Sequence, residues 1–180
     1  MKRKSTLVAL LLALMLGPGL SRGQEGSGPQ PKRARTPDDY TPRTLKELAA
    51  AEAGAESRGN KEETMRVHGD ILPSRVRASY AGSSRRLPQI KREVLRQWAL
   101  RFAGFPEGYT RPYETELLFA EDGAEFWLAV RRDGLLARPA RKLKRGDQFE
   151  LFLIRVGAAK LDDRWEPVLL VESSGRVFKN

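Results

Sequence analysis

The sequence contains no cysteine and only one histidine, and these two shortages exclude several chemistries. Without cysteine the chain can form no disulfide, no thiolate metal site and no thiol nucleophile. A single chain cannot bind a metal ion through two imidazoles, since His68 stands alone. A serine–histidine–acid triad would have to use His68 as its base. This residue lies beside an expected turn, which favours a structural position at the end of a strand over a catalytic role. Glycine-rich phosphate-binding loops are also missing. We therefore predict no metal and no cofactor.

Long hydrophobic runs are scarce, and the longest lies near the N-terminus. Residues 7–16 form an apolar run of ten residues, whereas a membrane-spanning helix needs about 20. Three basic residues precede this run, and Ser21 and Gly23 are small enough for the last positions of a cleavage site. We therefore expect residues 1–23 to be a signal peptide of a secreted or periplasmic protein. No transmembrane anchor is expected to remain after cleavage.

The composition divides the rest of the chain into three parts. Residues 24–43 are rich in proline, glycine and charge and poor in apolar side chains, which predicts a disordered linker. Residues 44–61 are expected to hold a short helix and a further linker. Residues 62–180 are long enough for one hydrophobic core and are expected to form a single globular domain.

The short helix is expected over residues 44–56. Thr44 and Glu47 have the spacing of a capping box, in which each side chain binds the free backbone N–H of the other. Leu45 and Leu48 provide its apolar face. The helix either docks on the domain or acts as a spacer.

A longer helix is expected over residues 87–103. Its apolar side chains recur at helical spacing, and Trp98 is interpreted as a core anchor. Gly104 is well placed to end the helix. Arg85, Arg92 and Arg96 are expected on its outer face. The apolar stripe consists of Leu87, Ile90, Val94, Leu95, Trp98 and Phe102.

Most other segments have the pattern of strands. Val76, Ala78 and Tyr80 alternate with polar residues, which predicts a half-buried strand before a loop at 81–84. Asp122-Gly123 is a strong hairpin signal between its flanking strands. The other expected strands lie at 65–72, 114–120, 125–131, 148–156 and 165–172, with a short last strand at Val177 and Phe178, and a hairpin connection at 157–164.

The order of these elements predicts an α+β fold. Two strands, one amphipathic helix and at least four antiparallel strands suit a small curled sheet or barrel. Oligonucleotide-binding and SH3-like barrels have a comparable size and strand density. The similarity is one of architecture, without a diagnostic motif for either.

The positive charge is concentrated in the globular part. The net charge of +10 falls to +6 without the four basic residues of the signal peptide. Residues 24–63 carry seven basic and eight acidic side chains, whereas residues 64–180 carry 22 and 15, a net charge of +7. A basic exported domain suits an anionic envelope polymer, anionic lipid or an acidic protein, and export disfavours nucleic acid. The alternative is that the positive charge only keeps the protein soluble and binds no partner.

Two groups of basic residues are the candidate binding surface. One belongs to the stretch at 138–145, and the other to the outer face of the expected helix at 87–103. Such side chains would hold a polyanion with a steep dependence on salt. The candidate residues are Arg138, Arg141, Lys142, Lys144, Arg145, Arg85, Arg92 and Arg96.

The basic stretch runs into an Arg-Gly-Asp tripeptide at 145–147 and then into an apolar segment. The tripeptide matches an adhesion motif, but it directly precedes a strand, where a tight turn is needed. We interpret it as a turn. Residues 148–156 are apolar on both faces of the expected strand, which predicts a central position in the sheet.

Paired carboxylates leave an enzymatic alternative open. Asp162-Asp163 suits a hairpin turn, and Glu114 and Glu116 would share one solvated face of a strand. A hydrolase would need two carboxylates converging across a cleft. We therefore favour a non-enzymatic binding or structural module with a basic face, and retain a carboxylate-dependent hydrolase with a site assembled from distant residues as the alternative.

Overall fold

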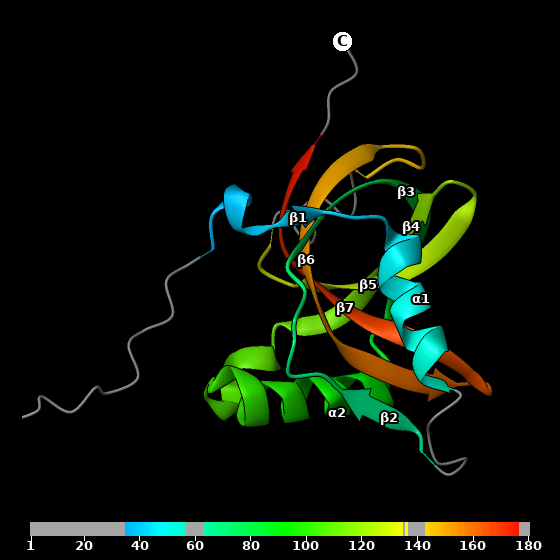
Figure 1. The fold of residues 1–180 in the computed structure, drawn as a ribbon. Helices are drawn as coiled ribbons and strands as arrows, with labels where there is room; N and C mark the ends of the chain where they lie inside the picture. Colours follow the sequence, from blue (N-terminus) through cyan, green and yellow to red (C-terminus); the bar gives the residue numbers. More distant parts are fainter. Residues whose placement is uncertain (1–34, 57–62, 135, 137–142, 177–180) are drawn as a thin grey trace, which may run out of the picture. The chain divides into compact units, whose positions relative to one another are not determined.

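The structure is a mixed α+β fold with one seven-stranded sheet, which confirms the α+β class predicted from the sequence (Figure 1). The predicted signal peptide and the predicted last strand lie outside the described residues. No helix in the described part of the chain is long and apolar enough to cross a membrane. This computed structural model describes residues 35–56, 63–134, 136 and 143–176.

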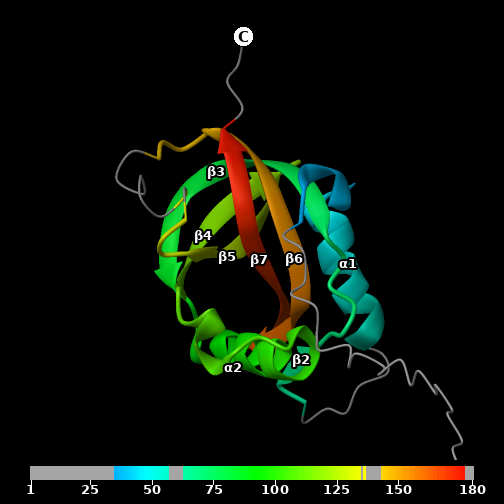
Figure 2. The ribbon, with the colours of Figure 1, turned by 90° about the vertical axis from the view of Figure 1, so that its left-hand side faces the viewer.

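Five strands of the sheet pair in a continuous series. In the order β3, β4, β5, β7 and β6 each strand pairs with the next, and β6 pairs again with β3, so the series returns to its start (Figure 2). The β5–β7 pairing is parallel and covers two residue pairs, whereas the other four pairings are antiparallel. Two short strands, β1 and β2, pair with β3 and β6. The strands are β1 (Thr41–Pro42), β2 (Met65–Val67), β3 (Ser74–Arg86), β4 (Tyr113–Glu121), β5 (Ala124–Arg131), β6 (Gln148–Leu161) and β7 (Arg164–Arg176).

Both hairpins turn at the aspartates that the sequence singled out. Asp122 and Gly123 have φ angles of 48° and 76°, and Asp162 and Asp163 have φ angles of 47° and 61°. Two successive positive φ angles suit a two-residue turn between twisted antiparallel strands. The second connection is shorter than the predicted 157–164, because both strands extend up to the two aspartates.

β3 continues through the segment that the sequence assigned to a loop at 81–84. The strand runs on to Arg86, with a bulge after Tyr80. Gly82 adopts a φ of 93° in this bulge, a conformation that glycine takes without steric cost. The alternation of side chains is interrupted there, which is why the sequence pattern indicated the end of the strand.

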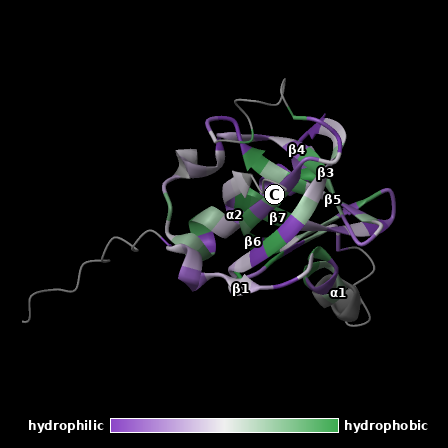
Figure 3. Ribbon diagram, turned by 90° about the horizontal axis from the view of Figure 1, so that it is seen from above, coloured by the Kyte–Doolittle hydropathy of each residue, from purple (hydrophilic) through white to green (hydrophobic). Residues whose placement is uncertain are grey.

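β6 occupies the predicted central position. It pairs with β3, β7 and β2, and its residues from Leu153 to Ala159 are buried on both faces. In Figure 3 hydrophobic segments lie along the strands, with hydrophilic bands between them. The run of apolar residues on both faces of β6 is therefore explained by its neighbours.

α1 (Leu45–Glu56) docks on the sheet. The predicted capping box is present, because Thr44 Oγ1 accepts the N–H of Glu47 at 3.1 Å and the Glu47 carboxylate accepts the N–H of Thr44 at 2.8 Å. Leu45 and Leu48 are fully buried in a core formed with β3, β4, β5, β6 and β7. The apolar pair and the hydrogen bond from the N–H of Leu45 to Glu121 of β4 hold this helix on the sheet, so the spacer interpretation is wrong.

Residues 35–43, which the composition assigned to the linker, also contact the sheet. Tyr40 is buried, its ring lies edge-on to Phe152 at 5.2 Å, and its hydroxyl donates to Glu172 at 2.7 Å. Arg35 binds the same carboxylate at 2.6 Å. One aromatic ring and one ion pair therefore order a segment whose average composition resembles a linker.

α2 (Gln89–Trp98) packs on a second buried cluster, formed with residues of β5, β6 and β7. It continues as the π-helix η2 (Ala99–Ala103) and ends at Gly104, whose φ of 64° gives the predicted left-handed cap. Trp98 is the predicted core anchor, but Phe102 is 46% exposed rather than part of the buried stripe. The wider π-turn shifts the residues after Trp98 out of the α-helical register.

Candidate functional site

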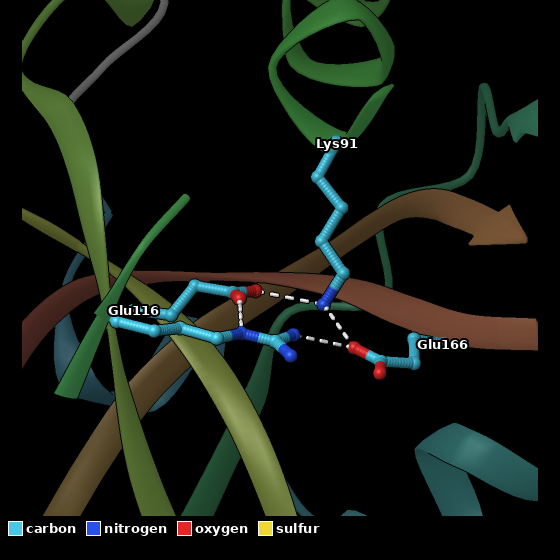
Figure 4. Close-up of polar contacts among 4 residues, drawn as sticks. Lys91, Glu116 and Glu166 are labelled. Atoms are coloured by element: carbon cyan, nitrogen blue, oxygen red, sulfur yellow. Dashed lines mark hydrogen bonds and ion pairs between the residues drawn. The ribbon is translucent and has the colours of Figure 1, made fainter. Parts of the chain in front are cut away.

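Four charged side chains form a closed ring of ion pairs between α2 and the sheet (Figure 4). Lys91 Nζ on α2 donates to Glu116 of β4 at 2.7 Å and lies 2.8 Å from Glu166 of β7. Arg85 of β3 donates to the same two carboxylates, through Nε to Glu116 and through Nη2 to Glu166, both at 2.6 Å. Each carboxylate therefore bridges both cations, and we call these four residues the ion-pair ring.

The ion-pair ring is buried at one end and reaches solvent at the other. Lys91 and Glu116 are 0% and 1% exposed, whereas Arg85 and Glu166 are partly exposed. Burial by itself raises the pKa of Glu166, but attraction to Lys91 and hydrogen bonds from Lys91 and Arg85 outweigh it, so the pKa lies below its ordinary value. With two cations facing two carboxylates, the ring tethers α2 to β3, β4 and β7.

Two members of the ion-pair ring correct expectations from the sequence. Arg85 was placed on the outer face of the helix, but it belongs to β3 and points at the ring. Glu116 was expected on a solvated strand face together with Glu114, but it is buried. A register shift between Tyr113 and Thr115 breaks the alternation on which that expectation depended.

Lys91 was not among the predicted site residues, although its spacing in the sequence indicates a buried position. It lies four residues after Leu87 and four before Leu95, so helical spacing puts it in the middle of the apolar stripe. A lysine at such a position indicates a buried partner. The sequence does not identify that partner, because Glu116 and Glu166 come from distant strands.

A groove of about 590 Å³ lies between α2 and the segment that joins the 3₁₀-helix η3 (Glu107–Thr110) to β4. Three arginines line it, Arg92 and Arg96 from α2 and Arg111 from the joining segment. Arg111 was not predicted, because a loop pattern gives no direction to a side chain. The other lining residues are Gln89, Glu93, Leu95, Thr110, Tyr113 and Glu114.

Arg92 and Arg111 supply the unpaired positive charge of the groove, whose lining also contains Glu114, 3.7 Å from Arg132. Both are exposed, and neither forms an ion pair with another described residue. Arg96, in contrast, donates to both carboxylate oxygens of Glu93, at 2.9 and 2.6 Å, and Gln97 donates to the same carboxylate at 2.8 Å. The hydrogen bonds from Arg96 and Gln97 lower the pKa of Glu93 to about 2, so this acid stays ionised and its charge is offset by Arg96.

The other predicted basic residues do not line this groove. Lys144 and Arg145 are exposed on the turn before β6, and Arg145 lies against the bulge of β3 at Gly82. The structure therefore brings together Arg92 and Arg96 from the predicted set and adds Arg111. Outside the described residues lie Arg138, Arg141 and Lys142.

The Arg-Gly-Asp tripeptide forms the predicted turn. The N–H of Asp147 donates to the carbonyl of Lys144 at 2.9 Å, and the Asp147 carboxylate accepts the N–H of Lys144, also at 2.9 Å. Gly146 adopts a φ of 89°, and its N–H donates to the carbonyl of Tyr80 at 2.8 Å. The aspartate side chain is thus engaged in shaping the turn.

Within the ranges that the structure describes, no group of three or more histidine, aspartate or glutamate side chains is arranged to hold a metal ion. His68 follows β2, and its N–H donates to the carbonyl of Val156 at 2.9 Å, which is the strand-end position predicted for it.

The sequence matches no protein-family model and no curated protein.

Proposed function

We propose that this chain is a non-enzymatic binding or structural module, secreted or periplasmic, that binds an anionic envelope polymer or an acidic protein partner. The observation that carries the proposal is the groove beside α2. Two exposed arginines from different elements, Arg92 and Arg111, line it without ion pairs among the described residues.

The chemistry of arginine supports an anionic ligand. A guanidinium group stays charged at every physiological pH and binds two oxygens of a phosphate, sulfate or carboxylate at once. Gln89 and Thr110 add neutral hydrogen-bonding groups to the same lining. Binding is favoured over hydrolysis because Glu93 is held ionised by Arg96 and the carboxylates of the ion-pair ring are held by cations.

We also infer that the five strands whose pairings return to their start form a small closed barrel. The strand number is that of the oligonucleotide- and oligosaccharide-binding barrel, in which the connection between the first two strands contributes to the binding site. The corresponding connection here leads from β3 to β4 and contains α2, η3 and the groove. Proteins that share a fold often differ in function, so the main support for the proposed binding function is the groove itself.

The double variant Arg92→Gln/Arg111→Gln is expected to bind phosphocellulose more weakly than the wild type. Each arginine that contacts a phosphate adds about one to the slope of log affinity against log salt concentration, so the loss of both should lower the slope by about two. Retention measured between low and physiological salt gives this slope. The matched control is Lys46→Gln/Arg164→Gln, which removes two exposed charges outside the groove. Equal losses in both double variants would show that only net charge matters and would contradict a site in the groove.

A further inference from the structure

The π-helical end of α2 exposes an apolar, a basic and an apolar residue in succession. Leu100 and Phe102 are 44% and 46% exposed, and they are the large hydrophobic side chains that the described residues leave exposed. Arg101 between them is exposed as well. Consecutive residues point in different directions around a helix, so this turn is open to solvent on more than one side.

The π-turn is the reason that Phe102 reaches the surface. An α-helix continued from Trp98 would place Phe102, four residues later, on the buried stripe. Instead the N–H of Gly104 donates to the carbonyl of Ala99, five residues back, which is the wider spacing of a π-turn. The ring of Phe102 lies beside Gly69, where a Cβ atom would come within 3.1 Å of it, and glycine offers no side chain to cover it. π-turns occur frequently at functional sites.

One basic side chain, Arg101, lies between the two exposed apolar residues. Arg101 has no ion-pair partner among the described residues, and Arg92 lies further back on the same helix with its charge uncompensated. The neighbouring acid, Glu93, is held by Arg96 and is also attracted to Arg101. Basic side chains beside exposed leucine and phenylalanine are the combination that binds an anionic membrane, with the cations at the headgroups and the apolar groups at the acyl boundary.

We propose that the outer side of this turn contacts the surface of an anionic phospholipid membrane, with Arg101 among the headgroups and Leu100 and Phe102 flanking it. The proposal goes beyond the binding function of the groove, because it names another surface and another partner. A soluble polymer would use the charges of the groove and leave the two apolar side chains exposed. A membrane covers them and also matches the charge of Arg101.

The absence of cysteine permits a local test with the full chain. A polarity-sensitive dye on the single thiol of Leu100→Cys is expected to shift its emission to shorter wavelength with phosphatidylglycerol vesicles and less with phosphatidylcholine vesicles. The same dye on Ser83→Cys, an exposed position in the β3 bulge, is expected to show no shift. In the Leu100→Cys background, Arg101→Gln should raise the vesicle concentration for half the shift about fivefold. A signal at position 100 that equals the signal at position 83 would overturn the proposal.

Two further measurements separate this proposal from that of the groove. Leu100→Ser/Phe102→Ser should leave retention on phosphocellulose unchanged, whereas Arg92→Gln/Arg111→Gln should lower it. Loss of retention in the first variant, with its thermal unfolding unchanged, would place the two apolar residues in the polymer site and overturn the membrane contact. An emission shift that appears without vesicles as the protein concentration rises would identify a second copy as the occupant, and would also overturn it.

Discussion

Replacing Lys91 by methionine is expected to lower the free energy of unfolding by about 3 kcal/mol, measured by urea denaturation. Methionine fills a similar volume, so little packing is lost. The change leaves Glu116, which is 1% exposed, without one of its two cationic partners and gives the ion-pair ring a net negative charge. A buried carboxylate that loses a partner keeps its cost of desolvation and loses much of its compensation.

A double variant provides the control for this prediction. Lys91→Met/Glu116→Leu removes both buried charges and leaves the 2.6 Å pair of Arg85 and Glu166 in place. The double variant should be more stable than either single variant, because no charge is left buried without a partner. Losses of stability that simply add would contradict the closed ring.

The same substitution should change the response to acid. The pKa of Glu166 is lower in the folded than in the unfolded protein, so its contribution is present above the unfolded value of about 4.3 and is lost as the pH falls toward the folded value. Lys91→Met removes the attraction that lowers this pKa. The stability of the wild type should therefore fall more steeply than that of the variant below about pH 5.

Replacing Gly157 by alanine is expected to lower the free energy of unfolding by about 3 kcal/mol or more. A Cβ atom at this position would overlap the backbone carbonyl of Arg66 and lie 2.7 Å from Cγ1 of Val94. Gly157 therefore permits the close approach of β2 and α2 to β6. The two contacts are a backbone carbonyl and a branched side chain on a helix, and neither can move aside easily.

Gly175→Ala is the matched control for this substitution. Gly175 is also a strand glycine, in β7, but a Cβ atom there would meet nothing within 4 Å. Its unfolding free energy should stay within about 0.5 kcal/mol of the wild type. Similar losses in both variants, measured by urea denaturation, would show that the cost comes from the loss of glycine and not from the crowded contact.

The features that sequence reasoning predicted are those with a local cause. The turn at Asp122-Gly123, the capping box of α1 and the end of the long helix at Gly104 each depend on a few neighbouring residues. The apolar stripe of α2 and the two apolar faces of β6 follow from periodicity, which acts over one element. Such features can be predicted without knowing which distant segment the element contacts.

The features that were missed depend on contacts between distant segments. The bulge of β3 after Tyr80 and the register shift of β4 move Arg85 and Glu116 from the expected exposed positions into the ion-pair ring. The π-turn moves Phe102 in the opposite direction. In a strand, one displaced residue reverses the side on which the following side chains lie, and in a helix it turns them by about 100° around the axis. Periodicity cannot report either displacement.

Two of the three arginines that line the groove, Arg92 and Arg96, were among the basic residues singled out from the sequence. Arg92 and Arg96 share a helix, so their proximity follows from their spacing. Arg111 joins them only because the chain returns from η2 through η3 to β4, which brings that segment beside α2. Its position in a loop pattern gave no indication of this contact.

The groove is tested most directly by nuclear magnetic resonance of the full chain during titration with inorganic polyphosphate. Saturable shifts are predicted for the backbone amides of Gln89, Arg92, Thr110 and Arg111, and they should weaken as salt is added. Shifts that gather instead on the turn at Lys144 and Arg145, or an absence of saturable shifts, would contradict the groove as the anion-binding site.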